Sequence, residues 1–371
     1  MACIGNMAMA FQNQAHMGRI HGISSHDTVL EAEFHCSGIC QKREMKLLLV
    51  QLQEMTVFKT QPAGQGLKMD CMFSGSDRQF SAAVGKNDFV TGSTERGGCL
   101  AHLVSDDLEN WEQLDPFVIP GFTDQPECTN YFEWNGWYYL LFSNYGTARY
   151  QYSRNPFGPW IYPENDIIDG LLYRVPKTAD FHGRRIACGF LCIHTAGESY
   201  AGNLVFRELC QNPDGTLGTC QVEETLPAIG GKMEELTLDA SAGGYRCGTF
   251  AGRGKRIKVR INREGQGGIY GLTLRKGDRT AYEIRFDPVR RTMGIFPANS
   301  CLYYCPTKRM LDGVKDLEDG VFLTLVIHED IWDICINGSR TLVCRMEEDW
   351  KGLRQIEGFV KDCRAVFKME Y

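Results

Sequence analysis

The sequence predicts an all-β fold, with a β-propeller in the first part of the chain and a β-sandwich in the second. Two patterns lead to this prediction. Turn-forming residues flanked by short β-rich runs recur every 48 residues, and a period of about 40–50 residues is typical of propeller blades. From about residue 234 onward, short runs of alternating apolar and polar residues are separated by frequent turns, which is typical of an antiparallel sandwich.

Length and composition agree with a globular protein of two domains. The chain has 371 residues, of which 43% are hydrophobic and 23% charged, and a chain of this length usually divides into more than one core. We expect a poorly defined N-terminal segment at 1–65, a propeller at 66–228 and a sandwich at 234–371. The likeliest linker between the last two is 228–233.

The repeat consists of three turns and the strands beside them. Turns are predicted at Asn87, Asn135 and Gly183, in steps of 48 residues. A second feature repeats in phase with the turns. It is a strand that ends in serine and leads through a polar turn into a tryptophan. Its two copies are Ser105 to Trp111 and Ser153 to Trp160. Two features in the same phase favour a repeated supersecondary unit over unrelated hairpins.

The second part of the chain has the residue pattern expected of a β-sandwich. Apolar and polar residues alternate at 258–261 and 282–286, as they do in a half-buried strand. The clearest hairpin joins 331–336 to 340–345 through Asn337-Gly338, because Asn-Gly favours the two-residue turns of antiparallel hairpins.

Charge and patterning exclude several classes of function. A net charge of −6 and a pI near 5.8 argue against a nucleic-acid-binding protein, which usually has a basic face. The sequence has neither a stretch of roughly 18 apolar residues for a membrane span nor the features of a secretory signal. We therefore expect a cytoplasmic protein with reduced cysteines. The three Cys-x3-Cys pairs lack the spacing of a zinc site, and neither a metal nor an organic cofactor is expected.

Two motifs in the predicted propeller resemble those of a known family. Ser105-Asp106-Asp107-Leu108 ahead of Trp111 is similar to a Ser-x-Asp-Leu-x-x-Trp stretch, and Pro126-Glu127-Cys128 is similar to a Glu-Cys-Pro segment, with threonine in place of the final proline. Both belong to glycoside hydrolase family 32, the invertase, levanase and inulinase relatives. The resemblance covers roughly residues 75–371, and the order and spacing of its motifs are its strongest signal.

The resemblance implies a five-bladed propeller with three acidic residues in a central funnel, complete or lacking a blade in this chain, followed by a sandwich. It also implies retaining hydrolysis or transfer at β-fructofuranosides, with a carbohydrate as partner. Glu127 occupies the position of the family's general acid/base. Its place behind Pro126 and ahead of an aromatic strand would desolvate it partly, which favours the protonated form that a general acid needs. The alternative is a glutamate in a surface loop.

The other acidic positions of the family match less well. Its Arg-Asp-Pro-Phe stretch falls near Asp77-Arg78-Gln79-Phe80. Aligning on Phe80 puts Arg78 at the position of the stabilising aspartate and Asp77 one residue early, and a slip of one residue turns a strand side chain to the other face. We take Asp77 as a catalytic candidate and Arg78 as a substrate-binding one. The sequence contains no Trp-Met-Asn-Asp-Pro segment, which carries the family's nucleophile, and this predicts a lost or heavily altered first blade.

Three further residues are candidates for substrate binding. Trp134 lies in an aromatic hairpin and could stack on a sugar ring or simply pack in a blade. Lys177 and Arg207 are polar residues in strand-like surroundings, where they form either structural ion pairs or sugar contacts.

Three functions remain open from the sequence. The first is a glycosidase that acts on fructosides or related furanosides, with Glu127 as general acid/base. The second is a carbohydrate-binding protein on the same scaffold without turnover. The third is an arabinosidase or xylosidase that works by inversion, with carboxyl groups roughly 6.5 to 9.5 Å apart.

Overall fold

The computed structural model describes residues 68–74, 80–86, 98–105, 112–122, 126–192, 202–265, 267–277, 280–298, 309–346, 350, 353 and 355–371. Almost all of these residues lie in strands or in the turns between them, and one 3₁₀ turn, η4, spans Glu223–Thr225. The predicted N-terminal segment 1–65 lies outside the described residues. No helix in the described part of the chain is long and apolar enough to cross a membrane. The chain divides into two compact units, Met1–Tyr131 and Phe132–Tyr371.

The first four strands, all within the first unit, form one antiparallel sheet. Four neighbours in sequence are neighbours in the sheet, in the order β1-β2-β3-β4. They are β1 (Lys68–Ser74), β2 (Phe80–Lys86), β3 (Cys99–Ser105) and β4 (Glu112–Val118). An antiparallel meander of four strands is the form of a propeller blade.

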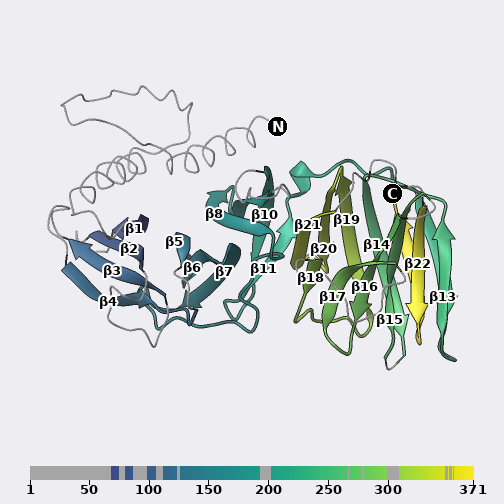
Figure 1. The fold of residues 1–371 in the computed structure, drawn as a ribbon, viewed down its shortest axis with the longest axis horizontal. Helices are drawn as coiled ribbons and strands as arrows, with labels where there is room; N and C mark the ends of the chain where they lie inside the picture. The colour runs from purple at the N-terminus through teal and green to yellow at the C-terminus, as the bar shows by residue number, and fades with distance from the viewer. Residues whose placement is uncertain are drawn as a thin grey trace, which may run out of the picture. The chain divides into compact units, whose positions relative to one another are not determined.

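Two further sheets have the same meander form. The first has the order β5-β6-β7 and the second the order β11-β10-β9-β8. Their strands are β5 (Glu127–Trp134), β6 (Trp137–Asn144), β7 (Thr147–Ser153), β8 (Tyr173–Phe181), β9 (Arg184–Cys192), β10 (Gly202–Gln211) and β11 (Leu217–Gln221). Figure 1 shows the strands of each sheet side by side. The predicted serines Ser105 and Ser153 are the last residues of β3 and β7.

Two of the three predicted repeat turns are confirmed. Asn135 and Gly136 join β5 to β6 with φ of 51° and 75°, and His182 and Gly183 join β8 to β9 with φ of 53° and 78°. Two successive positive φ values are the mark of a type I′ hairpin turn. The equivalent first positions are Asn135 and His182, so this step is one residue shorter than the predicted 48. The turn predicted at Asn87 lies outside the described residues.

The remaining strands form the predicted sandwich of two antiparallel six-stranded sheets (Figure 1). The first sheet, in the order β12-β23-β14-β19-β20-β21, contains β12 (Met233–Asp239), β23 (Arg364–Glu370), β14 (Arg256–Glu264), β19 (Gly320–His328), β20 (Ile331–Ile336) and β21 (Arg340–Arg345). The second sheet, in the order β13-β22-β15-β16-β17-β18, contains β13 (Tyr245–Phe250), β22 (Gln355–Lys361), β15 (Ile269–Lys276), β16 (Thr280–Asp287), β17 (Thr292–Pro297) and β18 (Met310–Leu311).

The sandwich core lies between these two sheets. Trp332 of β20 is fully buried and contacts Tyr282 of β16 edge to face, with ring centroids 6.2 Å apart. Trp350 packs against both, at 4.9 Å from Trp332 and 5.7 Å from Tyr282. Edge-to-face aromatic pairs at these distances add to the free energy gained by burial. The predicted hairpin at Asn337-Gly338 is confirmed, with φ of 52° and 63°.

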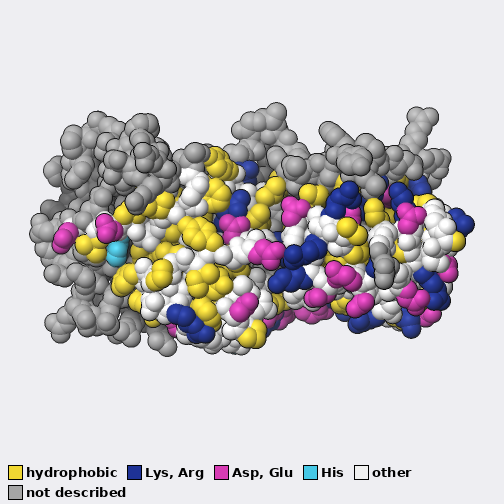
Figure 2. Space-filling view, turned by 90° about the horizontal axis from the view of Figure 1, so that it is seen from below, with side chains coloured by type: hydrophobic (Ala, Val, Ile, Leu, Met, Phe, Trp, Pro, Cys, Tyr) yellow, Lys and Arg dark blue, Asp and Glu magenta, His cyan; other side chains and the backbone are white. Residues whose placement is uncertain are grey.

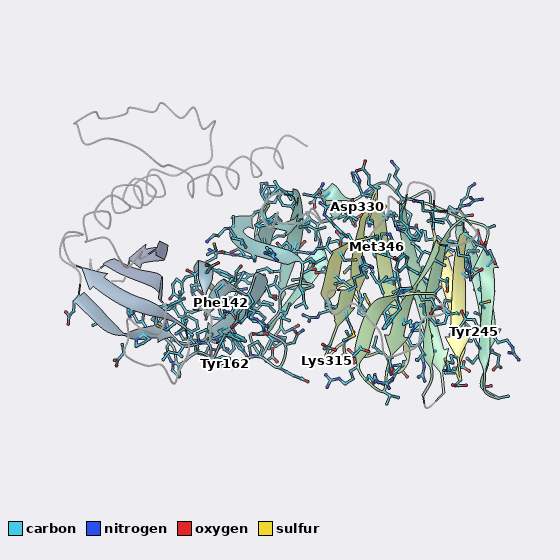
Figure 3. The ribbon with its side chains drawn as sticks, viewed as in Figure 1. Phe142, Tyr162, Tyr245, Lys315, Asp330 and Met346 are labelled. Carbon is cyan, nitrogen blue, oxygen red and sulfur yellow. The ribbon has the colours of Figure 1, made fainter. Side chains whose placement is uncertain are left out.

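The second unit joins its last blade-like sheet directly to the sandwich. The amide of Thr219 in β11 donates to the carbonyl of Ser339 at 2.8 Å, and the hydroxyls of Thr219 and Thr341 are 2.7 Å apart. At the β20–β21 end, where Asp330 and Met346 lie (Figure 3), Arg345 donates to the Asp330 carboxylate. The change from one set of sheets to the other falls between β11 and β12.

Candidate functional site

Glu127 is the first residue of β5, and β5 is an edge strand of its sheet. Its side chain is half-buried, and the preceding Pro126 is buried. Within the described residues the carboxylate has no hydrogen bond or ion pair. This half-buried carboxylate is therefore not committed to a structural partner among the described residues.

The backbone beside Glu127 is strained. Cys128 has a φ of 55° although it lies within a strand. A residue other than glycine rarely adopts this left-handed region, and such strain collects at sites where a side chain must be aimed. Thr129, the next residue, is buried, so the strained residue separates a half-buried glutamate from the packed part of the strand.

A similar irregularity occurs on β8, the edge strand of the next sheet. The pairing of β8 with β9 shifts register between Arg174 and Lys177, and Val175 has a φ of 48°. This is costly for a β-branched residue, and a bulge of this kind re-aims the side chains that follow it. Lys177 is the first paired residue after the bulge and is half-buried.

Trp134 ends β5 and is half-buried against the core of its sheet. Its ring lies 6.3 Å from that of Tyr139, and its carbonyl accepts a hydrogen bond from Gln211 at 2.9 Å. Burial raises the pKa of Tyr139 to about 12, so this phenol stays protonated and acts as a neutral donor and acceptor. The packing role of Trp134 is thus visible, and the residue as a whole is half-buried.

Among the substrate-binding candidates that lie in the described residues, Arg207 is the one whose side chain is fully buried. Its side chain is 1% exposed. Its Nε donates to Asp169 at 2.7 Å, and its two terminal nitrogens donate to Asp333 of β20 at 3.0 and 2.9 Å. Of the two alternatives that the sequence left open for Arg207, the structural ion pair is the one observed.

The ion pairs of Arg207 keep the guanidinium charged in the protein interior. Burial alone lowers the pKa of an arginine, but the Asp333 and Asp169 carboxylates outweigh it and hold the pKa of Arg207 above its usual value. Asp169 is itself fully buried and also accepts hydrogen bonds from the hydroxyl of Thr341 at 2.5 Å and the amide of Val343 at 2.8 Å. Each charge is therefore compensated, as a buried pair requires.

Two of the candidate residues lie outside the described part of the chain, and one buried aspartate was not among the candidates. Asp77 and Arg78 lie outside the described residues. Asp169 was missed by the sequence reasoning, and the aspartate-glycine pair at 169–170, next to a strand, was its only local signal.

Among the described residues, no group of three or more potential metal ligands converges. Cys188 lies buried within β9, and burial raises the pKa of its thiol to about 12.

The surface of the blade-like sheets carries exposed rings. Figure 2 shows hydrophobic side chains gathered over this part of the molecule and charges of both signs mixed over the sandwich. Phe157 and Tyr162, in the segment after β7, are 49% and 53% exposed. Exposed ring faces suit contact with the apolar C–H face of a sugar.

Comparisons with known proteins give a match of fold without a match of sequence. No family model and no curated protein matches the sequence. Among solved structures, a Bombyx mori GH32 β-fructofuranosidase, also solved in complex with sucrose, gives a TM-score of 0.55 at 14% identity, over 85% of this chain and 67% of that one. An Aspergillus kawachii β-fructofuranosidase complexed with glycerol gives 0.58 at 12% identity, over 85% and 72%.

A sucrose-6-phosphate hydrolase from Lactobacillus gasseri gives a TM-score of 0.53 at 17% identity, over 81% of this chain and 64% of that one. The chain thus spans about two thirds of the length of these proteins. At these identities the likeness shows the fold alone, and that fold is GH32-like: a β-propeller followed by a β-sandwich.

Proposed function

We propose that this chain is a glycosidase that acts on fructosides or related furanosides, with Glu127 as general acid/base. The single observation that carries the proposal is the position of Glu127. It is a half-buried carboxyl without a described partner, at the start of an edge strand and next to the strained Cys128. The GH32-like fold supports this proposal, because the solved neighbours are β-fructofuranosidases and a sucrose-6-phosphate hydrolase.

In this proposal Glu127 first donates a proton and later accepts one. Protonated Glu127 gives its proton to the glycosidic oxygen as the bond to the anomeric carbon breaks, and the resulting carboxylate then takes a proton from the water that attacks that carbon. Retention requires a second carboxylate about 5 to 5.5 Å away as nucleophile. Asp77 remains a proposed stabiliser of the developing charge, with Arg78, Trp134 and Lys177 as proposed sugar contacts.

The test is hydrolysis of sucrose, an inulin oligomer, and aryl arabinoside and xyloside by wild type and Glu127→Gln. We expect sugar release that falls by about 10² or more in the variant, which is the usual contribution of general acid/base catalysis. Glu133→Gln is the matched control, because Glu133 lies on the same strand but is exposed and accepts a hydrogen bond from the amide of Gly136 in the turn. Equal activity of Glu127→Gln and wild type would contradict the assignment.

The second candidate is a carbohydrate-binding protein without turnover. It is favoured by the sequence, which contains no segment resembling that of the family's nucleophile. Calorimetry with the same sugars separates the two functions, because binding without release by wild type would identify the second. Release with inversion at the anomeric carbon would instead identify an arabinosidase- or xylosidase-like mechanism.

A further inference from the structure

Two cysteines face each other across the β10–β11 hairpin. The Sγ atom of Cys210 lies 3.6 Å from the Sγ atom of Cys220. The strand register pairs Glu208 with Cys220 and Cys210 with Gly218, so the two thiols lie on one face of the sheet, diagonally across the hairpin. Gly218 lies directly opposite Cys210 in the register, and the space beside it is filled by the backbone of Ser339. A disulfide has an S–S distance of about 2.05 Å, so the two atoms need to approach by only about 1.5 Å.

The two thiols are chemically unequal. Cys210 and Cys220 are half-buried, in contrast to the buried Cys335 nearby. The hydrogen bond that Cys210 donates lowers the pKa of Cys220, to which Arg184 and Arg207 also contribute, whereas the same bond raises the pKa of Cys210. Burial and the Glu208 carboxylate oppose the lowering at Cys220, so the shared hydrogen bond is what makes Cys220 the member of the pair more readily deprotonated, and the thiolate is the form that oxidation attacks.

We propose that Cys210 and Cys220 form a peroxide-sensitive dithiol that closes to a reversible disulfide within the hairpin. The Cys220 thiolate attacks one oxygen of a hydroperoxide, the O–O bond breaks, and the sulfur becomes a sulfenic acid while water or an alcohol leaves. The Cys210 sulfur then attacks this sulfenic sulfur and a second water leaves. Two thiols are oxidised by two electrons, and the peroxide is reduced by the same two.

The place of the pair in the fold gives the oxidation a structural consequence. Arg207, on β10, reaches from this sheet to Asp333 of the sandwich, and Gln221, next to Cys220, donates to the carbonyl of Asp333 at 3.1 Å. The charged and thiol groups that face the pair are Arg184, Arg207, Glu208 and Cys335. A covalent link between β10 and β11 restrains the hairpin that carries these contacts, and the cross-link also restricts the unfolded chain.

The experiment uses the full chain, reduced and then treated with hydrogen peroxide. Remaining thiols are alkylated and the peptides are mapped by mass spectrometry. We expect a cross-linked peptide pair that contains Cys210 and Cys220 and lacks two hydrogens, and dithiothreitol should restore both as alkylatable thiols. In Cys210→Ser, the Cys220 sulfenic acid should persist and react with dimedone.

Cys247→Ser is the matched control, because Cys247 is exposed on β13 of the sandwich. It should leave the cross-link unchanged. The proposal is overturned if Cys210 and Cys220 stay alkylatable while Cys247 is oxidised, or if the cross-link found joins either thiol to Cys335. The wild-type peptide map decides this even if a serine variant fails to fold, and it does not depend on glycosidase activity.

Discussion

Individual side chains of the first unit show how burial sets protonation. His102 of β3 is 8% exposed and packs edge to face on Phe117, with ring centroids 5.3 Å apart. Desolvation lowers the pKa of its imidazole below the ordinary 6.5, because an apolar environment disfavours the charged form. His102 is therefore neutral in the fold under conditions where the unfolded chain already begins to take up its proton.

This difference predicts how the stability of the first unit depends on pH. Above about pH 6.5 both states are neutral and the full stability is present. As the pH falls below this value toward the lowered folded pKa, the unfolded state binds more protons and stability is lost, by at most about 1.4 kcal/mol per pH unit. Hydrogen exchange of β2–β4 between pH 5 and 8 measures the effect. His102→Gln should flatten the dependence, whereas His328→Gln, an exposed histidine of β19, should not; an unchanged slope in His102→Gln contradicts the argument.

For individual residues, the sequence identified candidates but did not predict the side chains that surround them in the fold. It selected Arg207 as a polar residue among strands, yet the partners that define its role, Asp169 and Asp333, lie 38 and 126 residues away in the chain. Distant partners of this kind are set by tertiary packing, which local pattern does not encode. Cys210 and Cys220 are different, because they lie only ten residues apart on neighbouring strands of one hairpin, so their proximity depends on local structure.

The stability of the hairpins in the blade-like sheets depends on the backbone conformation of their turns. Gly183 has a φ of 78°, and a Cβ added there would meet no atom within 4 Å. Any cost of Gly183→Ala is therefore backbone strain alone, which we expect to lower the unfolding free energy by about 1–2 kcal/mol. His182→Asn at the first turn position should instead be neutral or stabilising, because asparagine is preferred there. Urea unfolding of both variants tests this, and equal stability of Gly183→Ala and wild type would exclude a strained type I′ turn.

The sequence predicted elements well wherever local chemistry decides the backbone. Asn135-Gly136 and Asn337-Gly338 both form the expected hairpin turns, because these residues accept positive φ. The bulge at Val175 was not predictable, since a valine in left-handed geometry contradicts its own preference and is imposed by its surroundings. Irregular positions on edge strands were thus the part of the candidate site that local pattern did not reveal.

At the scale of the second unit, the last blade-like sheet and the sandwich share one buried ionic junction. Asp169 and Arg207 come from the blade side and Asp333 from β20. The sequence predicted both kinds of fold, a propeller and a sandwich. It contained no signal for their attachment, because that attachment is made by side chains that meet only after each part has folded.

This junction predicts that the two parts unfold together. Arg207→Met removes the cation and leaves Asp169 buried without it, so we expect the unfolding free energy to fall by about 3 kcal/mol. The loss should appear in hydrogen exchange of both β10–β11 and β20–β21. Arg290→Ala is the control, because its ion pair with Asp287 is 57% exposed on the arginine side and is worth at most about 1 kcal/mol. If β20–β21 keeps its wild-type protection while β10–β11 loses it, the sandwich is stable by itself and Arg207 only secures the blade. If both lose protection equally, folding of the sandwich and of this sheet is one cooperative event, and changes in the β10–β11 hairpin reach the sandwich through Arg207.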